Sequence, residues 1–576
     1  MTAVRRLIFT IAPSLIAVTL FAQQTTPRQT TPRATESVTA ETDQDVTNPR
    51  ALQLSLDAAI RTSMERNLGV QLQEFEYREA SHSLRSQYGI YDALATADIR
   101  EQSRQSPVTS SIQANASREL SVDLGVAQNL PTGGSYGFSF NNARSVSAGG
   151  PQTVTPAYTP NVGFRFNQPL LRDFGMDINR RFITIARNTL GISAETFRSQ
   201  LMDTAVSVEQ AYLNLVYARR AVEVVKQSLF LARDQARITQ IRIDVGASAP
   251  LDILQPRVTI ATSEEQLIIA AANVRSAEDQ LRQLLNLAPE EWDRPIIPTD
   301  DVAYTPMTIN VDDAVRRAIE LRPEVRQDRL ATDTRRMQYL FARNQTLPQV
   351  DLNANYGFAG VAGSVLARDP NTGEIVIGDR IPYGRGLRQI VEGDFPSWSV
   401  GVNVSVPITN IGARAEARRA ELDLQQSRVT EQQTRQIIAV DVRQAVRDVD
   451  TASRTIVATR AARDAAERNV EAERRRYENG MTTNFQVLEV QQQLSDARVR
   501  ELQALVGYNQ AVARYHRAVG DVLEVRNISV DVPELAQEPR IFSGLDRYNW
   551  LNYGSRVDDD ADGDSGDATR NDDGDH

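Results

Sequence analysis

The chain has 576 residues, a formal net charge of −10 and no cysteine, while 41% of its residues are hydrophobic and 24% are charged. The absence of cysteine excludes disulfides, thiolate metal sites and lipid attachment through an N-terminal cysteine. The histidines His82, His516 and His576 lie far apart in the sequence, so we expect no metal site, and no cofactor motif is present.

Residues 1–22 have the features of a secretory signal peptide. Arg5 and Arg6 precede an apolar run that ends near Leu20, and Ala22 offers a cleavage site. The run is too short to span a membrane as a helix. Residues 23–50 are rich in Thr, Pro and Gln, which predicts a disordered periplasmic leader.

The rest of the chain contains one design twice: a strand ending in proline, a long helix, a glycine turn and a second helix. The segment at residues 161–169 recurs at 400–407, and the helix start at 54–60 recurs at 309–315. We therefore interpret the chain as an internal duplication that forms one pseudo-symmetric body. The predicted divisions after the leader are a first repeat at 51–288, a linker at 289–308, a second repeat at 309–526, an equatorial C-terminal segment at 527–555 and a disordered acidic tail at 556–576.

Alternating apolar and polar residues predict strands in both repeats. The pattern occurs at residues 120–127, 136–140, 162–167, 350–358 and 397–406. One apolar face and one small polar face are typical of a strand with lipid outside and water inside, although a half-buried soluble sheet gives the same alternation.

The number of strands limits what a single chain can form. Membrane barrels need at least about eight strands, and an open edge in lipid leaves backbone groups unpaired. With two strands in the second repeat and two to four in the first, the pattern predicts a barrel shared by a cyclic homotrimer. The tight turn from Leu130 to Gly134 further predicts an extra hairpin with its turn in the periplasm, which makes six strands per chain.

Very long helices follow the strands. Residues 413–479 contain no Gly or Pro, which predicts one helix about 100 Å long. Apolar residues at alternating steps of three and four, beginning at Leu201 in the first repeat and Ala439 in the second, indicate coiled-coil packing. Gly246 and Gly480 end the two long helices. Helices alone would also fit a periplasmic coiled-coil scaffold without a pore, which remains the alternative.

Two short motifs indicate other chemistry but lack the necessary context. Gly133 to Gly137 has the spacing of a serine nucleophile elbow, yet it joins two predicted strands rather than a strand and a helix. Asp558 to Gly563 fits the first half of a calcium loop, but the twelfth position is Thr569 instead of glutamate. We therefore expect neither an enzyme nor a nucleic-acid-binding protein.

In its order of elements the chain resembles the TolC-like outer-membrane efflux proteins from about Leu52 to Arg526. The similar segments are Leu54-Ser-Leu-Asp-Ala-Ala, Gln168-Pro-Leu-Leu, Val406-Pro-Ile, Tyr477-Glu-Asn-Gly480 and Phe485-Gln-Val-Leu-Glu489. The resemblance implies an α+β membrane protein in which a trimeric, shared β-barrel continues into a long α-helical coiled-coil tunnel. It also implies an outer-membrane location with the helices in the periplasm.

The resemblance implies partners as well. Proteins of this family dock on a periplasmic adaptor, or membrane fusion, protein and on an inner-membrane pump of the RND, ABC or MFS type. They act as the passive export duct of tripartite efflux or type I secretion systems. The adaptor contact would lie on the hairpin turns at Gly246 and Ala247 and at Gly480 and Met481.

Gating residues are also implied by the resemblance. Tyr477 and Asp252 stand where the family holds the tunnel closed by a hydrogen bond, which we name the aperture lock. Glu489 and Gln486 stand where two aspartates form an aperture ring, so only one of the two acidic positions is kept. An arginine that supplements the lock is Thr482 here.

Overall fold

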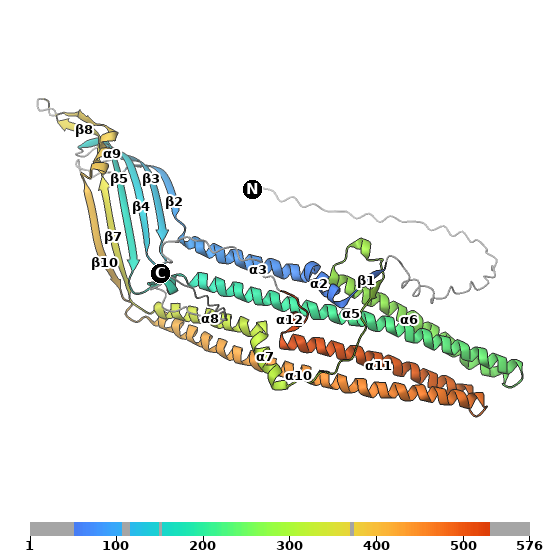
Figure 1. Ribbon diagram of the computed structural model, residues 1–576. Coiled ribbons are helices and arrows are strands. Elements are labelled where there is room, and N and C mark those ends of the chain that lie inside the picture. The colour runs from blue at the N-terminus through green and yellow to red at the C-terminus, as the bar shows by residue number, and fades with distance from the viewer. Residues whose placement is uncertain are drawn as a thin grey trace, which may run out of the picture.

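The computed structural model describes residues 51–105, 107, 116–148, 153–368, 372 and 374–529. The molecule is elongated, with a β-sheet at one end and two long helical hairpins that run away from it (Figure 1). The expected signal peptide, leader, acidic tail and calcium-loop residues, and all but the first residues of the segment at 527–555, lie outside the described residues.

In each repeat, helices come before and after the strands along the chain. The first repeat contains β1 (Leu52–Leu54), α2 (Leu56–Arg66), α3 (Leu68–Gln87), η1 (Tyr88–Tyr91), β2 (Leu94–Gln105), β3 (Ala116–Asn129), β4 (Ser135–Ala148), β5 (Val154–Pro169), α4 (Met176–Asn179), α5 (Arg181–Asp244), η2 (Pro250–Ile253) and α6 (Leu254–Leu285). The connection and the second repeat contain η3 (Pro289–Glu291), β6 (Ile296–Pro298), α7 (Val311–Leu321), α8 (Pro323–Asn344), β7 (Gln349–Ala359), β8 (Ala362–Arg368), β9 (Ile375–Ile381), α9 (Tyr383–Glu392), β10 (Pro396–Ser405), α10 (Ile411–Glu478), α11 (Asn484–Val519) and α12 (Val522–Val525).

The long helices have the predicted extent. α5 has 64 residues and α10 has 68, so each is about 100 Å long. α6 and α11 pack along their far halves, while α3 and α8 pack along the halves near the sheet (Figure 1). The predicted apolar seam is buried between these helices, since Tyr212 and Leu215 in α5 and Val442 and Ile456 in α10 are at most 1% exposed.

The helix before the strands is broken at one residue in both repeats. Asn67 has an extended backbone between α2 and α3, and its Oδ1 accepts hydrogen bonds from Gly69 N at 2.9 Å and Val70 N at 3.3 Å. Arg322 occupies the equivalent place between α7 and α8, where Pro323 disfavours the helical conformation of the preceding residue. A capping side chain and a proline therefore cause the same break independently.

Six strands form one continuous antiparallel wall in the order β10-β7-β5-β4-β3-β2. The first repeat supplies four of them and the second supplies two, so the expected six strands per chain are confirmed. β8 and β9 form an additional hairpin whose first strand pairs with the outer end of β5. The sequence did not predict this hairpin.

The turn between β3 and β4 lies at the helical end of the sheet, as the extra hairpin requires. Thr132 O accepts a hydrogen bond from Gly175 N, next to α4, at 3.2 Å. Gly133 has a φ of 95°, and a Cβ there would lie 2.2 Å from Asp173 O, so the turn requires glycine. Because Ser135 starts a strand rather than a helix, the turn is no nucleophile elbow.

A small parallel sheet ties the beginning of the first repeat to its end. β1 pairs with β6 through Leu52 and the fully buried Ile296, so part of the predicted linker is regular structure. The buried Glu278 carboxylate accepts hydrogen bonds from Ile296 N at 3.1 Å, Arg219 at 2.7 Å and Arg282 at 3.1 Å. These partners satisfy a carboxylate that would be costly to bury alone.

A group of charged residues, the charged junction, joins the two repeats beside the break at Arg322. The Arg322 guanidinium donates to Glu324 at 2.9 Å and to Asp441 of α10 at 3.3 Å. Arg517 of α11 lies 3.6 Å from Glu324 and also pairs with Asp203 of α5. Burial raises the pKa of Glu324, but the hydrogen bonds and charge of Arg322 outweigh burial and lower this pKa below its ordinary value.

The charged junction should make the stability of the helical part depend on acid. Because the folded-state pKa of Glu324 is lowered, its ionised form stabilises the fold above its ordinary pKa, and this contribution is lost as the pH falls through the folded-state pKa. Glu324→Gln should cost about 1–3 kcal/mol at neutral pH, because Arg322 loses a charged acceptor.

Unfolding midpoints measured from neutral pH to about pH 3 should therefore fall more steeply in the wild type than in Glu324→Gln. Glu416→Gln is the matched control, since Glu416 is 65% exposed and its partner Arg419 lies 3.9 Å away. Parallel pH profiles for the wild type and Glu324→Gln would contradict the assignment.

Candidate functional site

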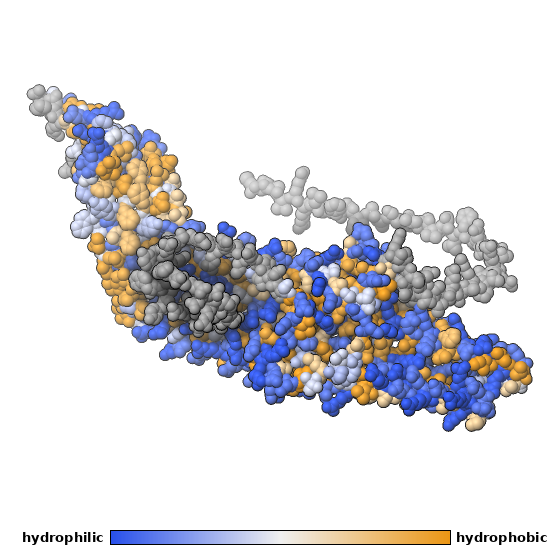
Figure 2. All heavy atoms as spheres, in the orientation of Figure 1, coloured by the Kyte–Doolittle hydropathy of each residue, from blue (hydrophilic) through white to orange (hydrophobic). Residues whose placement is uncertain are grey.

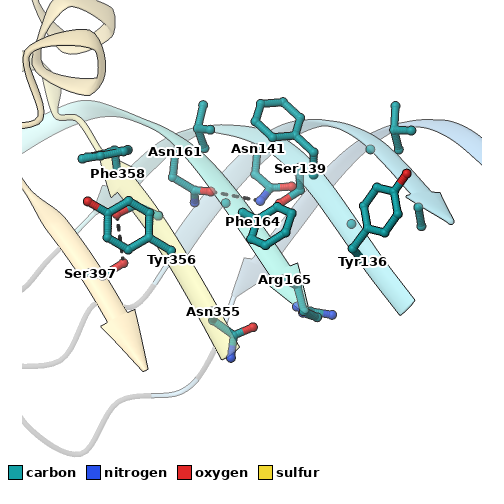
Figure 3. A pocket seen from close by; sticks show the side chains of 18 of the residues that line it. Tyr136, Ser139, Asn141, Asn161, Phe164, Arg165, Asn355, Tyr356, Phe358 and Ser397 are labelled. Carbon is teal, nitrogen blue, oxygen red and sulfur yellow. Dashed lines mark hydrogen bonds between the residues drawn. The ribbon is translucent and has the colours of Figure 1, made fainter. Parts of the chain in front are cut away.

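One face of the sheet carries only small polar or glycine residues along a row that crosses all six strands. The directly paired residues of this row are Thr96, Gly125, Ser139, Gly163, Gly357 and Ser397. A hollow of about 890 Å³ is lined by these six residues and their neighbours. Figure 3 shows Ser139 and Ser397 on the strands that border it. No large side chain of this row projects from the sheet, so the row leaves space in front of the strands.

Amide side chains on the same face join neighbouring strands. Asn141 Nδ2 donates to Asn161 Oδ1 at 3.0 Å, a bond drawn in Figure 3. Asn355 Nδ2 donates to Ser399 Oγ at 3.2 Å between β7 and β10. Since each amide keeps further donors and acceptors, this face can hydrogen-bond water over its whole width.

The opposite face is apolar along two complete rows. The first row is Ala95, Val126, Phe138, Phe164, Tyr356 and Trp398. The second is Ala97, Leu124, Phe140, Val162, Phe358 and Pro396. Trp398 is 74% exposed, and hydrophobic side chains gather over the sheet in Figure 2. The register thus confirms the predicted separation into an apolar and a polar face.

Both edges of this wall are free in a single chain. All residues of the edge strands β2 and β10 are exposed. Because every neighbouring pair is antiparallel and the number of strands is even, β2 and β10 run in opposite directions. The β2 edge of one copy can therefore continue the antiparallel pattern with the β10 edge of another.

The two far turns have the same geometry. Gly246 and Gly480 adopt positive φ angles of 77° and 71° after α5 and α10. Ala247 N donates to Arg242 O at 2.7 Å, and Met481 N donates to Arg476 O at 2.8 Å, each closing a Schellman motif. The predicted turn residues therefore cap two equivalent helices.

Hydrophobic side chains are exposed around these turns. Val245 is 73% exposed, Leu251 74%, Met481 72% and Phe485 58%. Figure 2 shows hydrophobic side chains at this far end of the helical part. Clusters of exposed apolar residues are a common feature of surfaces that dock other proteins.

Tyr477 is buried between the hairpin tips and contacts Arg242 of the other repeat. The Arg242 guanidinium carbon lies 4.5 Å from the centre of the Tyr477 ring, and Arg242 Nη1 donates to Tyr477 O at 3.0 Å. The Asp252 carboxylate instead accepts a hydrogen bond from Ala249 N at 3.1 Å, which caps η2. Within the described chain the Tyr477 hydroxyl and Asp252 are not hydrogen-bonded, so the aperture lock stays a prediction.

Sequence reasoning missed Arg242, although a signal was present. Arg242 precedes Gly246 by the same number of residues as Arg476 precedes Gly480. Aligning the two turns places Arg242 at the position of Arg476, the residue before Tyr477, and so marks this arginine as a shared feature of both tips.

The predicted ring residues lie at the start of α11. Thr483 Oγ1 accepts a hydrogen bond from Gln486 N at 3.4 Å, which caps the helix. Gln486 and Glu489 are both exposed, and the Glu489 carboxylate accepts a hydrogen bond from Gln493 at 3.2 Å. An exposed carboxylate in this place is free to face a lumen, but the ring itself stays a prediction.

The described part of the chain lacks two features, a metal-binding cluster and a membrane-spanning helix. No group of three or more His, Asp or Glu side chains there is arranged to hold a metal ion. No helix in the same ranges is both long and apolar enough to cross a membrane.

Known proteins share this arrangement. Residues 121–287 and 314–521 match the family described as "Outer membrane efflux protein". The chain is 22% identical over 306 residues to "Outer membrane efflux protein BepC" of Brucella suis biovar 1, with 53% of this chain and 63% of that protein matched. It is also 22% identical over 342 residues to "Outer membrane protein TolC" of Escherichia coli, with 57% and 63% matched.

In both cases the match covers less than two thirds of the relative's length. Among solved structures, the CmeC outer membrane channel of Campylobacter jejuni superposes with a TM-score of 0.58 at 14% identity, covering 83% of this chain and 87% of that one. Since the family match spans both repeats and most of the described chain, the protein belongs to the outer membrane efflux protein family.

Proposed function

We propose that this protein is a passive export channel in which three copies close one β-barrel in the outer membrane. The carrying observation is the wall itself, where one face has a complete row of Gly, Ser and Thr and the opposite face has two complete apolar rows. Such a wall separates water from lipid only when it is closed, because unpaired edges are costly in lipid.

The number of copies follows from the family resemblance and is consistent with the strand count. One chain supplies six wall strands, so three copies give eighteen. Barrels of 16–18 strands leave an aqueous channel rather than a core filled by side chains. The polar face would then line the channel, and the apolar rows would face the lipid.

The helices would continue the duct into the periplasm. At about 100 Å they are long enough to carry the lumen well away from the membrane. We propose that the exposed apolar turns at Val245, Leu251, Met481 and Phe485 dock on a periplasmic adaptor protein, which links the duct to an energised inner-membrane pump of a tripartite efflux or type I secretion system.

Cross-linking between edge strands tests the trimeric barrel. The natural chain has no cysteine, so Ala97→Cys on β2 can be combined in turn with Val400→Cys, Val402→Cys or Val404→Cys on β10. These strands lie at opposite edges of one chain, so a disulfide can form only between copies. Oxidation in native membranes should give covalent trimers for at least one pair.

The matched control places the second cysteine inside the wall. Phe164→Cys on β5 is on the same face of the sheet as Ala97, but β3 and β4 separate the two positions. Ala97→Cys with Phe164→Cys should remain monomeric on denaturing gels. Monomers from every edge pair would exclude the shared barrel.

Closure of the tip is tested by separating two contributions of Tyr477: its observed contact with Arg242 and its predicted hydrogen bond to Asp252. Arg242→Gln removes the guanidinium from the ring and should raise single-channel conductance in planar bilayers, since three lost contacts of about 1 kcal/mol each favour opening at least tenfold. Tyr477→Phe keeps the ring beside Arg242 and removes only the hydroxyl.

The variants Arg242→Gln, Tyr477→Phe and Asp252→Ala give distinguishable results. Higher conductance in Tyr477→Phe and in Asp252→Ala would establish the aperture lock. Unchanged conductance in both, with an increase in Arg242→Gln, would assign closure to the Arg242 contact. Unchanged conductance in all three would exclude both contacts from gating.

The aperture ring makes a separate prediction. If three Glu489 carboxylates face the lumen at the narrowest point, they favour cations by Coulomb attraction. Glu489→Gln should reduce the cation-to-anion permeability ratio, measured as the reversal potential in a salt gradient, without affecting assembly. Asp450→Asn, on an exposed carboxylate near the middle of α10, is the control. An unchanged reversal potential would remove Glu489 from the conduction path.

A further inference from the structure

The short helix α9 lies on the apolar face of the wall, at its outer end. Gly360, directly after β7, lies so close to α9 that a Cβ there would be 2.1 Å from Gly386 O. Ala362, which pairs with Tyr158 and so shares its face, is fully buried beside Gly386. Tyr383 at the start of α9 packs edge-on against Tyr158 at 5.7 Å.

The register identifies that face. Tyr158 lies on β5 at an even step from Val162 and Phe164, which belong to the apolar rows. A Cβ at Gly393, just after α9, would meet the Phe358 ring of the same face at 3.3 Å. Both ends of α9 therefore contact the side of the sheet that the apolar rows occupy, next to β5, β7 and β8 (Figure 1).

The sequence of α9 gives the helix three distinct sides. At about 100° per residue, Gly386 and Gln389 fall together on the side that meets the sheet. Gln389 Oε1 accepts a hydrogen bond from Val361 N at 2.9 Å, which fixes this side. Tyr383, Leu387 and Val391 fall on a second side, and Val391 is 87% exposed.

The third side of α9 is basic. Arg385 and Arg388 lie on it and are exposed, with the Arg388 side chain at 75%. The Arg388 guanidinium lies 3.6 Å from Glu392, and an exposed pair of this kind is weak. Arg385 forms no ion pair with any described residue. One apolar and one basic edge on a short helix are typical of a segment that lies in a membrane interface.

We propose that α9 is an interfacial anchor that inserts Val391 between acyl chains and binds the phosphate groups of anionic outer-leaflet lipid through Arg385 and Arg388. The apolar edge continues the lipid-facing surface, since α9 leads directly into β10 and the 74% exposed Trp398. Guanidinium groups bind phosphate by charge-assisted, bidentate hydrogen bonds. The proposal rests on an outer-membrane location and not on export, so it can fail while the channel function holds.

Lipid retention by the full assembly tests this anchor. The wild type, Arg385→Gln/Arg388→Gln and the control Arg418→Gln/Arg454→Gln are reconstituted in nanodiscs of phosphatidylcholine with or without diphosphorylated lipid A. Arg418 and Arg454 on α10 have side chains that are each 80% exposed, so the control removes the same charge elsewhere. Bound lipid phosphate after purification and the melting temperature are measured.

Lipid A should raise the melting temperature of the wild type and of the control. The α9 variant should bind lipid A about tenfold more weakly and lose this shift, because two basic side chains near an anionic surface are removed. Val391→Asn should weaken retention in the same direction, whereas Val457→Asn on α10, 63% exposed in the wild type, should not.

Three results would overturn the proposal. Equal retention in the α9 variant and the wild type would exclude a lipid site at the arginines. An equal shift with inorganic phosphate would identify a site for free phosphate instead of lipid. A loss of trimers in the α9 variant without lipid A would assign α9 to the interface between copies.

Discussion

The proposed barrel depends on one constraint, the pairing of backbone N–H and C=O groups at the two free edges of the wall. In lipid these groups would have no water as an alternative partner, so the proposal requires that β2 and β10 pair with strands of other copies. An even number of strands per chain makes that pairing antiparallel and compatible with cyclic symmetry. The extra β3–β4 hairpin keeps the number even, because it adds one strand in each direction. A single inserted strand would have reversed one edge and made the pairing between copies parallel.

Periodicity allowed most of the fold to be predicted. The alternation from Trp398 to Val404 is expected for a wall whose two faces meet different environments. The register of β10 with β7 places these apolar side chains on one face. The breaks at Asn67 and Arg322 escaped prediction because a helical pattern continues across them, and only the local capping contacts show the interruption. The hairpin β8–β9 and α9 escaped because their residues are short runs between glycines, without a repeat partner in the first half.

The candidate site was predictable in position but not in its contacts. Both tip turns are marked by a glycine in the sequence, and both close in the same way. The residue that each side chain contacts at the turns depends on how the helices pack. The Asp252 carboxylate can reach a backbone N–H only three residues away, and this local cap competes with any bond across the hairpins. Tyr477 is held by Arg242 from the neighbouring hairpin, a contact that depends on how two helices 235 residues apart in sequence pack.

The width of the proposed barrel determines where the flow through the duct is controlled. Eighteen strands about 4.8 Å apart and tilted by about 40° enclose a barrel roughly 36 Å across between backbones. The row of Gly, Ser and Thr on the polar face would add little obstruction to such a barrel. Resistance in a series of segments is dominated by the narrowest, so the proposal places control at the far ends of the helices rather than in the wall. A docking partner would act there on contacts of about 1 kcal/mol, such as the Arg242 and Tyr477 pair. In the proposed trimer a weak contact repeated in each copy would be sufficient to keep a wide duct closed and would still allow a partner to open it.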